Sequence, residues 1–162
     1  MESGMPEEVP LLVKGKTWQE MPLGSSFRTA ARSITEADLI NFITMFGFIE
    51  PLFWDASSAG SAGYRGRLVP GALTYAMAEG LVLQSGVIHG TGIAFLGMDL
   101  EIHAPVFVGD TLDAVVVVTE ARPSSKHGRG IVRTEVSVRN QERSNVLTYR
   151  PLRLIRGAGE AE

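Results

Sequence analysis

The segment Gly47–Asp55 (GFIEPLFWD) contains the pair of side chains best suited to proton transfer. Glu50 and Asp55 lie five residues apart in it, among aromatic and aliphatic neighbours. Apolar surroundings raise the pKa of a carboxyl group, so one acid of such a pair can donate a proton while the other accepts one. Each residue also has a simpler interpretation, because Asp55 can cap a short helix that begins after it and Glu50 can be a solvated carboxylate.

Other catalytic groups are scarce. The absence of cysteine excludes disulfides, thiolate metal sites and a thiol nucleophile. The three histidines are not at metal-ligand spacing, and we expect His89 in a surface loop, His103 on a sheet face and His127 at a hairpin tip. Ser57 and Ser58 lack the Gly-x-Ser-x-Gly turn of a serine hydrolase. No metal and no cofactor are therefore expected.

Composition and charge indicate a soluble protein. The chain has 162 residues, 44% of them hydrophobic, and its formal net charge of −3 argues against binding to nucleic acid. No apolar run is long enough to span a bilayer, so no membrane association is expected, and the acidic first residues do not resemble a signal peptide. We expect a cytoplasmic protein with one domain at residues 16–156 and flexible tails at residues 1–15 and 157–162.

Two helices must position these groups. Helical spacing of Leu, Ile and Phe predicts the first over residues 34–46, where Ser33 and Glu36 have capping-box spacing and Thr35 is a competing N-cap. Gly47 is a natural end for this helix, because glycine readily adopts the left-handed backbone conformation.

The second helix is predicted over residues 72–83 (ALTYAMAEGLVL), with Pro70 and Gly71 at its opening. It is apolar on nearly every side, which indicates that other elements wrap around it. Backbone N–H groups at the start of a helix can stabilise negative charge, and glycine allows a ligand to approach them closely. The surroundings of Gly71 are therefore the best-placed anion-stabilising feature of the chain.

Alternation of apolar and polar residues predicts antiparallel strands in the second half of the chain. Together with an earlier strand at residues 27–33, this predicts an α+β domain in which a buried helix precedes a four-strand meander. The four expected strands cover residues 93–103, 111–121, 130–141 and 146–155.

Four segments resemble the MaoC-like dehydratases and (R)-specific enoyl-CoA hydratases, which have the hotdog fold, a long central helix wrapped by an antiparallel β-sheet. GRLVPGAL (66–73) resembles the segment that opens the central helix in that family, and IAFLGMDLEIHAPVFVGDTL (93–112) resembles the next strand and turn. GRGIV (128–132) and VRNQ (138–141) resemble the last hairpins. The resemblance covers residues 16–156 and implies the hotdog fold.

The resemblance also implies where the chemistry takes place. The catalytic segment of the family has the pattern Gly-Asp-x-Asn-Pro-(Leu/Ile)-His-x-Asp, in which the Asp and the His hold or activate the water that crosses the 2,3-bond of an acyl thioester. Alignment places Phe48 at that Asp and Phe53 at that His, and neither phenylalanine can transfer a proton. Glu50 and Asp55 then become substitute catalytic candidates. The expected substrate-binding residues are Phe48, Phe53, Pro70, Gly71 and Ala72.

Three functions stay open on this basis. The first is an acyl-thioester hydratase or dehydratase, acting on acyl-CoA or an acyl-carrier thioester, with an altered acid–base site. The second is a catalytically inactive hotdog subunit that binds acyl-CoA or pairs with an active homologue, and the third is a hotdog acyl-CoA thioesterase. Hotdog domains pair through their sheet edges, which predicts a homodimer or a heterodimer with a related hotdog chain.

Overall fold

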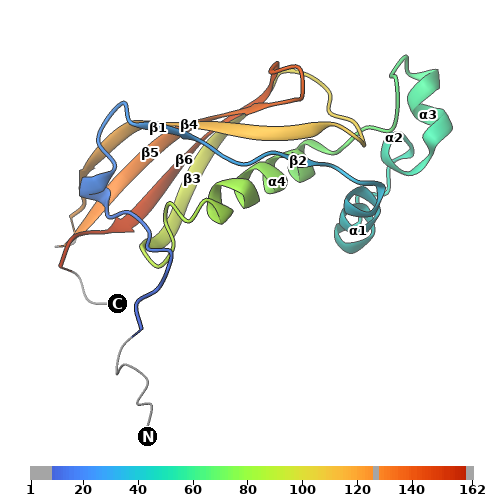
Figure 1. Cartoon of the computed structure of the whole chain (residues 1–162). Helices are drawn as coiled ribbons and strands as arrows, with labels where there is room; N and C mark the ends of the chain where they lie inside the picture. The colour runs from blue at the N-terminus through green and yellow to red at the C-terminus, as the bar shows by residue number, and fades with distance from the viewer. Residues whose placement is uncertain (1–8, 126–127, 160–162) are drawn as a thin grey trace, which may run out of the picture.

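The computed structural model describes residues 9–125 and 128–159. An antiparallel sheet curves around one long helix, and three shorter helices lie beyond one end of that helix (Figure 1). The predicted α+β architecture is confirmed. The strands are β1 (Ser26–Arg28), β2 (Arg32–Ser33), β3 (Gly92–Ile102), β4 (Thr111–Pro123), β5 (Arg129–Arg139) and β6 (Asn145–Arg156); the helices are α1 (Glu36–Phe46), α2 (Pro51–Trp54), α3 (Ala56–Ser61), α4 (Gly71–Gln84) and a short 3-10 turn, η1 (Trp18–Glu20).

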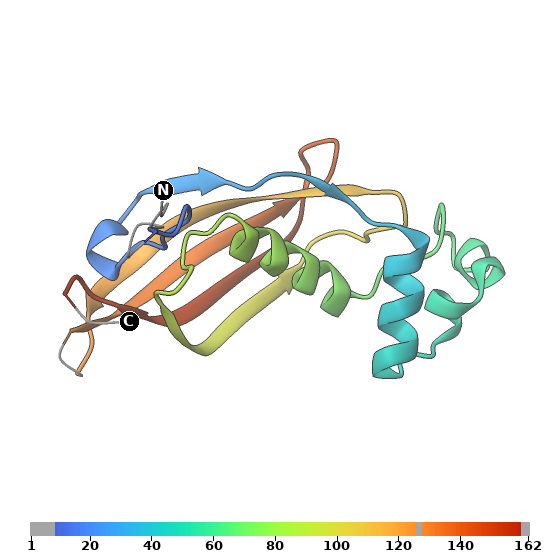
Figure 2. The same cartoon turned by 60° about the horizontal axis from the view of Figure 1, so that its bottom comes forward.

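The strand order differs from the predicted meander in one respect. β4, β5 and β6 are consecutive neighbours, but β3 pairs with β6 at the far edge, so the order is β1-β4-β5-β6-β3. The reason is the connection between β3 and β4, which crosses the end of the sheet beside the start of α4 (Figure 2). In this connection Phe107 forms a bridge with Leu68, and the Val69 N–H donates to the Val106 carbonyl at 2.8 Å. One wall of the candidate site is thereby brought to α4.

The expected strand at residues 27–33 is divided into β1 and β2. Between them the Thr29 hydroxyl accepts the Ala114 N–H at 3.0 Å, while the Thr29 N–H donates to the Ala114 carbonyl at 2.9 Å. A side chain thus replaces the backbone carbonyl in the ladder, which interrupts regular pairing. β2 resumes the pairing with β4 at Arg32.

Helix α1 begins and ends through local contacts. Its N-cap is Thr35, which accepts the Asp38 N–H at 3.2 Å, and Asp38 in turn accepts the Thr35 N–H at 2.8 Å. The alternative cap is excluded because Ser33 belongs to β2, where its hydroxyl contacts that of Thr111 at 2.6 Å. Gly47 ends the helix with φ of +72°, as predicted.

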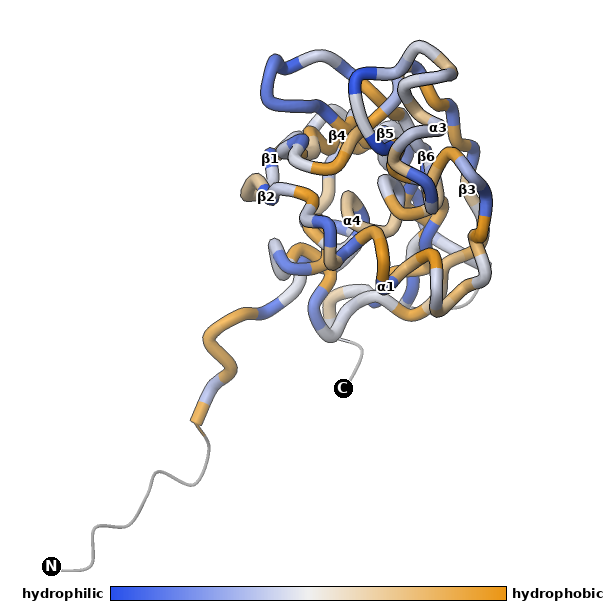
Figure 3. The backbone as a smooth tube through the Cα atoms, turned by 90° about the vertical axis from the view of Figure 1, so that its right-hand side faces the viewer, coloured by the Kyte–Doolittle hydropathy of each residue, from blue (hydrophilic) through white to orange (hydrophobic). Residues whose placement is uncertain are grey.

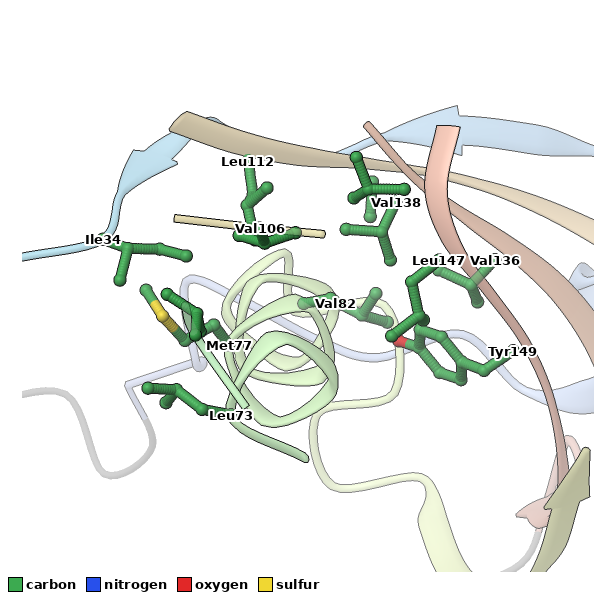
Figure 4. Close-up of a cluster of buried hydrophobic side chains, with 14 of the residues drawn as sticks. Ile34, Leu73, Met77, Val82, Val106, Leu112, Val136, Val138, Leu147 and Tyr149 are labelled. Atoms are coloured by element: carbon green, nitrogen blue, oxygen red, sulfur yellow. The ribbon is translucent and has the colours of Figure 1, made fainter. Parts of the chain in front are cut away.

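Helix α4 supplies much of the core. Figure 4 shows Leu73 and Met77 on one side of the helix, with Leu147 and Tyr149 of β6 on the other. Within this chain the expected wrapping is incomplete, because Ala72, Ala76 and Leu83 are exposed. The residues of α4 that are buried are Leu73, Thr74, Met77, Ala78, Leu81 and Val82.

The side of α4 that faces β3 is open. Seen from the end that carries α1 to α3, α4 lies between β2 and β3 (Figure 3). On β3, Phe95, Met98 and Ile102 pair with core-facing positions of β6 yet remain exposed. The open side continues along the length of β3, which is an edge strand with one free row of backbone hydrogen-bonding groups.

Part of the predicted N-terminal tail lies against this framework. The Gly15 N–H donates to the His89 carbonyl at 2.9 Å, and Val13 contacts the backbone at Gly86. The tail residues 1–8 and 160–162 and the hairpin-tip residue His127 lie outside the described residues. In the part of the chain that is described, α4 is the longest helix, and none is long and apolar enough to cross a bilayer.

Candidate functional site

The start of α4 opens onto a small apolar cavity. The cavity has a volume of about 160 Å³, and it lies between α4, the β3–β4 connection and the α2 segment. Gly71 lines it directly: a side chain at this position would collide with Ile102 of β3. Among the described residues no ionisable side chain lines this cavity. We call it the Gly71 cavity; its walls include Phe53, Thr74, Ile102, Val106 and Leu147.

Arg67 fixes the position of Phe53 on this cavity. Its Nε and Nη2 atoms donate to the Phe53 carbonyl at 3.2 and 2.8 Å, and its Nη1 forms an ion pair with Glu36 at the start of α1. A bidentate guanidinium contact fixes orientation as well as distance. One side chain therefore ties α1, the α2 segment and the strand-like approach to α4 into one unit.

Asp110 holds the opposite wall of the cavity. This carboxylate is buried and accepts the Phe107 N–H at 2.9 Å, the Gln141 amide at 3.1 Å and the Arg65 guanidinium at 2.5 Å. The same guanidinium lies 4.2 Å from the centre of the Phe107 ring. Arg65 is thus committed to a contact within the fold. The turn VFVGD carried the signal for this role, because an aspartate after a glycine commonly binds its own turn.

The two carboxylates proposed from sequence do not line the Gly71 cavity. Glu50 is exposed, and its carbonyl accepts the Phe53 and Trp54 N–H groups as α2 begins. Asp55 caps α3, as its simpler interpretation predicted: its carboxylate accepts the Ser57 N–H at 2.9 Å and the Ser57 and Ser58 hydroxyls. Hydrogen bonds from Ser57 and Ser58 lower the pKa of Asp55, the reverse of what a proton donor at neutral pH requires.

The proposed substrate-binding residues separate into two groups. Phe53 and Gly71 share the Gly71 cavity. Phe48 instead packs on Phe42, with ring centres 5.1 Å apart, Pro70 is the buried N-cap residue of α4, and Ala72 is exposed on the far side of the helix. The structure therefore brings together one of the two aromatic replacements and the helix-opening glycine.

A second polar cluster lies two turns further along α4. Glu79 accepts the Tyr149 hydroxyl at 2.8 Å and the Arg153 guanidinium at 2.5 Å. Tyr149 is fully buried, and Tyr75 packs edge-on against it with ring centres 5.0 Å apart. Burial and the neighbouring Glu79 carboxylate raise the pKa of Tyr149 far above its ordinary value. We call these residues, Glu79, Tyr149 and Arg153, the Glu79 cluster.

The Glu79 cluster was not among the sites predicted from the sequence. Two signals were present: Glu79 is the only charged residue in the apolar helix, and Arg153 occupies an inward position in the alternating pattern of β6. An isolated charge on an otherwise apolar helix needs a partner when it is buried. Among the described residues, no three His, Asp or Glu side chains lie close enough together to hold a metal ion.

The arrangement of these elements defines the class of domain. A solved structure of Rv0216 from Mycobacterium tuberculosis, described as a double hotdog fold, superposes with a TM-score of 0.79 over 91% of this chain and 46% of that one, at 21% identity. A monoamine oxidase regulatory protein from Archaeoglobus fulgius superposes with a TM-score of 0.82 at 27% identity, covering 90% of this chain and 97% of the other. The fold is the hotdog fold, as the resemblance implied.

Sequence comparison places the chain within that class. The family described as MaoC like domain matches residues 19–140, and the chain belongs to this family. The chain is 34% identical to Protein MaoC of Klebsiella aerogenes over 70% of its own length, and this match spans 33% of the Klebsiella protein. It is 31% identical to the (R)-specific enoyl-CoA hydratase of Aeromonas caviae, over 64% of this chain and 75% of that enzyme.

Proposed function

We propose that this chain binds an acyl thioester of CoA or of a carrier protein and adds or removes water across its 2,3-bond. The observation that carries the proposal is the Gly71 cavity, in which the first turn of α4 meets an apolar space. Enolate charge develops on the thioester carbonyl during this reaction, and N–H groups at a helix N-terminus stabilise such charge. A hydratase among the curated relatives and the family itself support the same chemistry.

Glu50 is the better substitute for the missing acid–base pair. Its carboxylate makes no hydrogen bond within the described residues, whereas that of Asp55 is held by Ser57 and Ser58. In the proposed hydration Glu50 takes a proton from water as the water oxygen bonds to C3, and a proton returns to C2. The net change is one water added across the double bond. Because Glu50 does not line the Gly71 cavity, this role requires the segment before α2 to move toward it.

The direct test is an assay of the purified chain with crotonyl-CoA and longer trans-2-enoyl-CoAs. We expect hydration that Glu50→Gln reduces about 100-fold or more, the usual contribution of a positioned acid or base. Glu142→Gln, which changes an exposed glutamate in the β5–β6 turn, is the matched control. Hydration that survives Glu50→Gln unchanged would assign proton transfer to another group, with Asp55→Asn as the next variant.

A binding subunit without catalytic activity is the second candidate. It is favoured by the absence of any ionisable side chain on the Gly71 cavity among the described residues. Measurable acyl-CoA binding without turnover, together with activity restored by a related hotdog chain, would select it. Release of free CoA in the same assay would instead select a thioesterase.

We propose that the open edge of β3 joins a second hotdog chain, either a copy of this one or a relative. Support comes from the apolar side chains Phe95, Leu96, Met98 and Ile102, each of them at least 38% exposed on this strand. A solved HadBC dehydratase complex from Mycobacterium tuberculosis shares the fold, at 20% identity. Light scattering should give twice the mass of one chain, and Leu96→Lys should lower the measured mass toward that of a single chain.

The cytoplasmic location stays a prediction.

A further inference from the structure

A second cavity lies on the open side of α4, away from the first turn. It has a volume of about 440 Å³ and is bounded by the second half of α4, the connection to β3 and β3 itself. Leu83, Ile88 and Phe95 give it apolar walls, while Glu79 and Arg153 bring charges to it. We call it the Arg153 cavity.

Arg153 has hydrogen-bond donors to spare in this cavity. Its Nη2 atom donates to Glu79, and within residues 9–125 and 128–159 no other acceptor bonds to this guanidinium. A guanidinium carries five N–H donors in one plane. The Arg153 side chain is only 9% exposed and lines this cavity, and among the described residues none of its nitrogens belongs to the fully buried atoms that lack a hydrogen bond.

The Glu79 carboxylate, unlike the Arg153 guanidinium, has no unused oxygen, because each of its two oxygens accepts a hydrogen bond. One of its oxygens accepts from Arg153 and the other from the buried Tyr149 hydroxyl. The ion pair therefore has no net charge, and a second carboxylate or a phosphate bound to Arg153 would lie close to the Glu79 carboxylate. A neutral oxygen that accepts one or two N–H groups suits this environment better than an anion.

The cavity lies within reach of a ligand held at Gly71. Gly71, Tyr75 and Glu79 follow one another at intervals of four residues, so they lie along the same side of α4. Eight residues of α-helix correspond to about 12 Å along the axis. Slim chains extend over such distances, and both the acyl group and the pantetheine arm of a thioester are slim chains.

We propose that the Arg153 cavity binds a neutral oxygen of the thioester substrate through the spare N–H groups of Arg153. This inference rests on the proposed function, since it extends the thioester site along α4. The oxygen has two chemical sources, an amide carbonyl of the pantetheine arm or an oxygen carried by the acyl group. In either case an unsubstituted long alkyl chain is a poor occupant, because it displaces water from the guanidinium donors without accepting a hydrogen bond in its place.

Titration calorimetry of the full chain with pantetheine, CoA, hexanoyl-CoA and 6-hydroxyhexanoyl-CoA tests this assignment. Arg153→Lys keeps a positive charge beside Glu79 but removes the planar set of donors, and we expect it to weaken binding about tenfold or more. Arg122→Lys, at an exposed ion pair on β4, is the matched control. Leu83→Trp is a second variant that fills the cavity without altering the ion pair, and it should weaken the same ligands.

The pattern of losses identifies the source of the oxygen. Equal weakening of pantetheine and all CoA compounds assigns it to the pantetheine arm, while weakening confined to 6-hydroxyhexanoyl-CoA assigns it to the acyl group. Unchanged dissociation constants for all four ligands in both folded variants would overturn the Arg153 cavity proposal and leave the proposed function intact. A wild-type chain that binds none of the CoA compounds would instead overturn the proposed function.

Discussion

The two halves of α4 differ in how they use charge. At its first turn the described walls of the Gly71 cavity carry apolar and small polar side chains, whereas two turns later Glu79 and Arg153 form an ion pair beside a buried tyrosine. Both halves face the same sheet and the same open side toward β3. The difference shows that burial in this domain does not by itself exclude charge; charge is admitted where each group has a partner.

The comparison also separates binding from proton transfer. Backbone N–H groups lie at the helix start, as the proposed thioester site requires, but no ionisable side chain among the described residues lines the cavity there. The Glu79 cluster has titratable groups, yet Glu79 and Tyr149 are bonded to each other and the raised pKa of Tyr149 keeps its proton in place. Within the described residues, the cavity at the helix start is thus lined by no titratable side chain, and the titratable groups of the cluster are already paired.

The largest expected effect comes from breaking the Glu79 cluster. Glu79→Leu leaves the Arg153 charge buried without its partner, which should lower the free energy of unfolding by about 3 kcal/mol or more. Urea denaturation measures this loss. The double variant Glu79→Leu with Arg153→Met should regain most of it, because no unpaired charge remains. A loss below 0.5 kcal/mol for the single variant would mean that the pair contributes no more than an exposed one.

A proton-transfer group introduced at the apolar half should change the rate rather than the stability. Phe53→His places an imidazole on the Gly71 cavity, at the position where the family pattern has its histidine. We expect hydration of crotonyl-CoA to rise about 100-fold over the wild type, in line with a positioned general acid or base. Phe53→Leu is the control for the change in shape. If the histidine variant were no faster than the leucine variant, the proposal that hydration takes place at the Gly71 cavity would be contradicted.

Two alanine substitutions in α4 probe the close approach at its start. Gly71→Ala introduces a methyl group against Ile102 and into the Gly71 cavity, so we expect about tenfold weaker thioester binding, or 1.4 kcal/mol. Gly80→Ala in the same helix is the matched control, because the added carbon would have no described atom within 4 Å apart from its chain neighbours and the backbone of its own helix. It should leave binding unchanged and raise the melting temperature slightly. Equal effects of the two variants on binding would remove Gly71 from the site.

The smallest effect concerns the cap of α3, outside both halves of α4. The pKa of Asp55 lies below its ordinary value of 3.8 because Ser57 and Ser58 donate hydrogen bonds to the carboxylate. The contribution of this cap to stability is therefore present above pH 3.8 and is lost as the pH falls through the lowered folded-state pKa. An NMR titration of the Ser57 amide should show a midpoint below 3.8. A midpoint at or above that value would indicate an unbonded carboxylate.

The features that could be predicted from sequence depend on short-range contacts. Gly47 ends α1 and Asp55 caps α3 through partners within a few residues, and α4 differs from its predicted bounds by one residue at each end. Such contacts leave their mark in neighbouring residue types. The joint presence of Phe53 and Gly71 on one cavity followed from the family resemblance rather than from local pattern.

The features that could not be predicted join residues distant in the chain. Glu79 and Arg153 are 74 residues apart, and Arg65 and Asp110 are 45 apart. Their pairing depends on which strands become neighbours, and the position of β3 beside β6 was itself not evident from alternation. Periodicity predicts that a segment forms a strand, but it does not specify the partner of that strand.

The contacts of Arg67 have a consequence for the wall of the Gly71 cavity. One guanidinium bonds the carbonyl of Phe53 and the carboxylate of Glu36, so the same side chain holds both the α2 segment beside the Gly71 cavity and the first turn of α1. Loss of the Arg67 side chain should therefore loosen the α2 segment and the first turn of α1 together. Under the proposed function, Arg67 shapes the thioester site through the position of Phe53, although Arg67 itself is not among the residues that line the cavity.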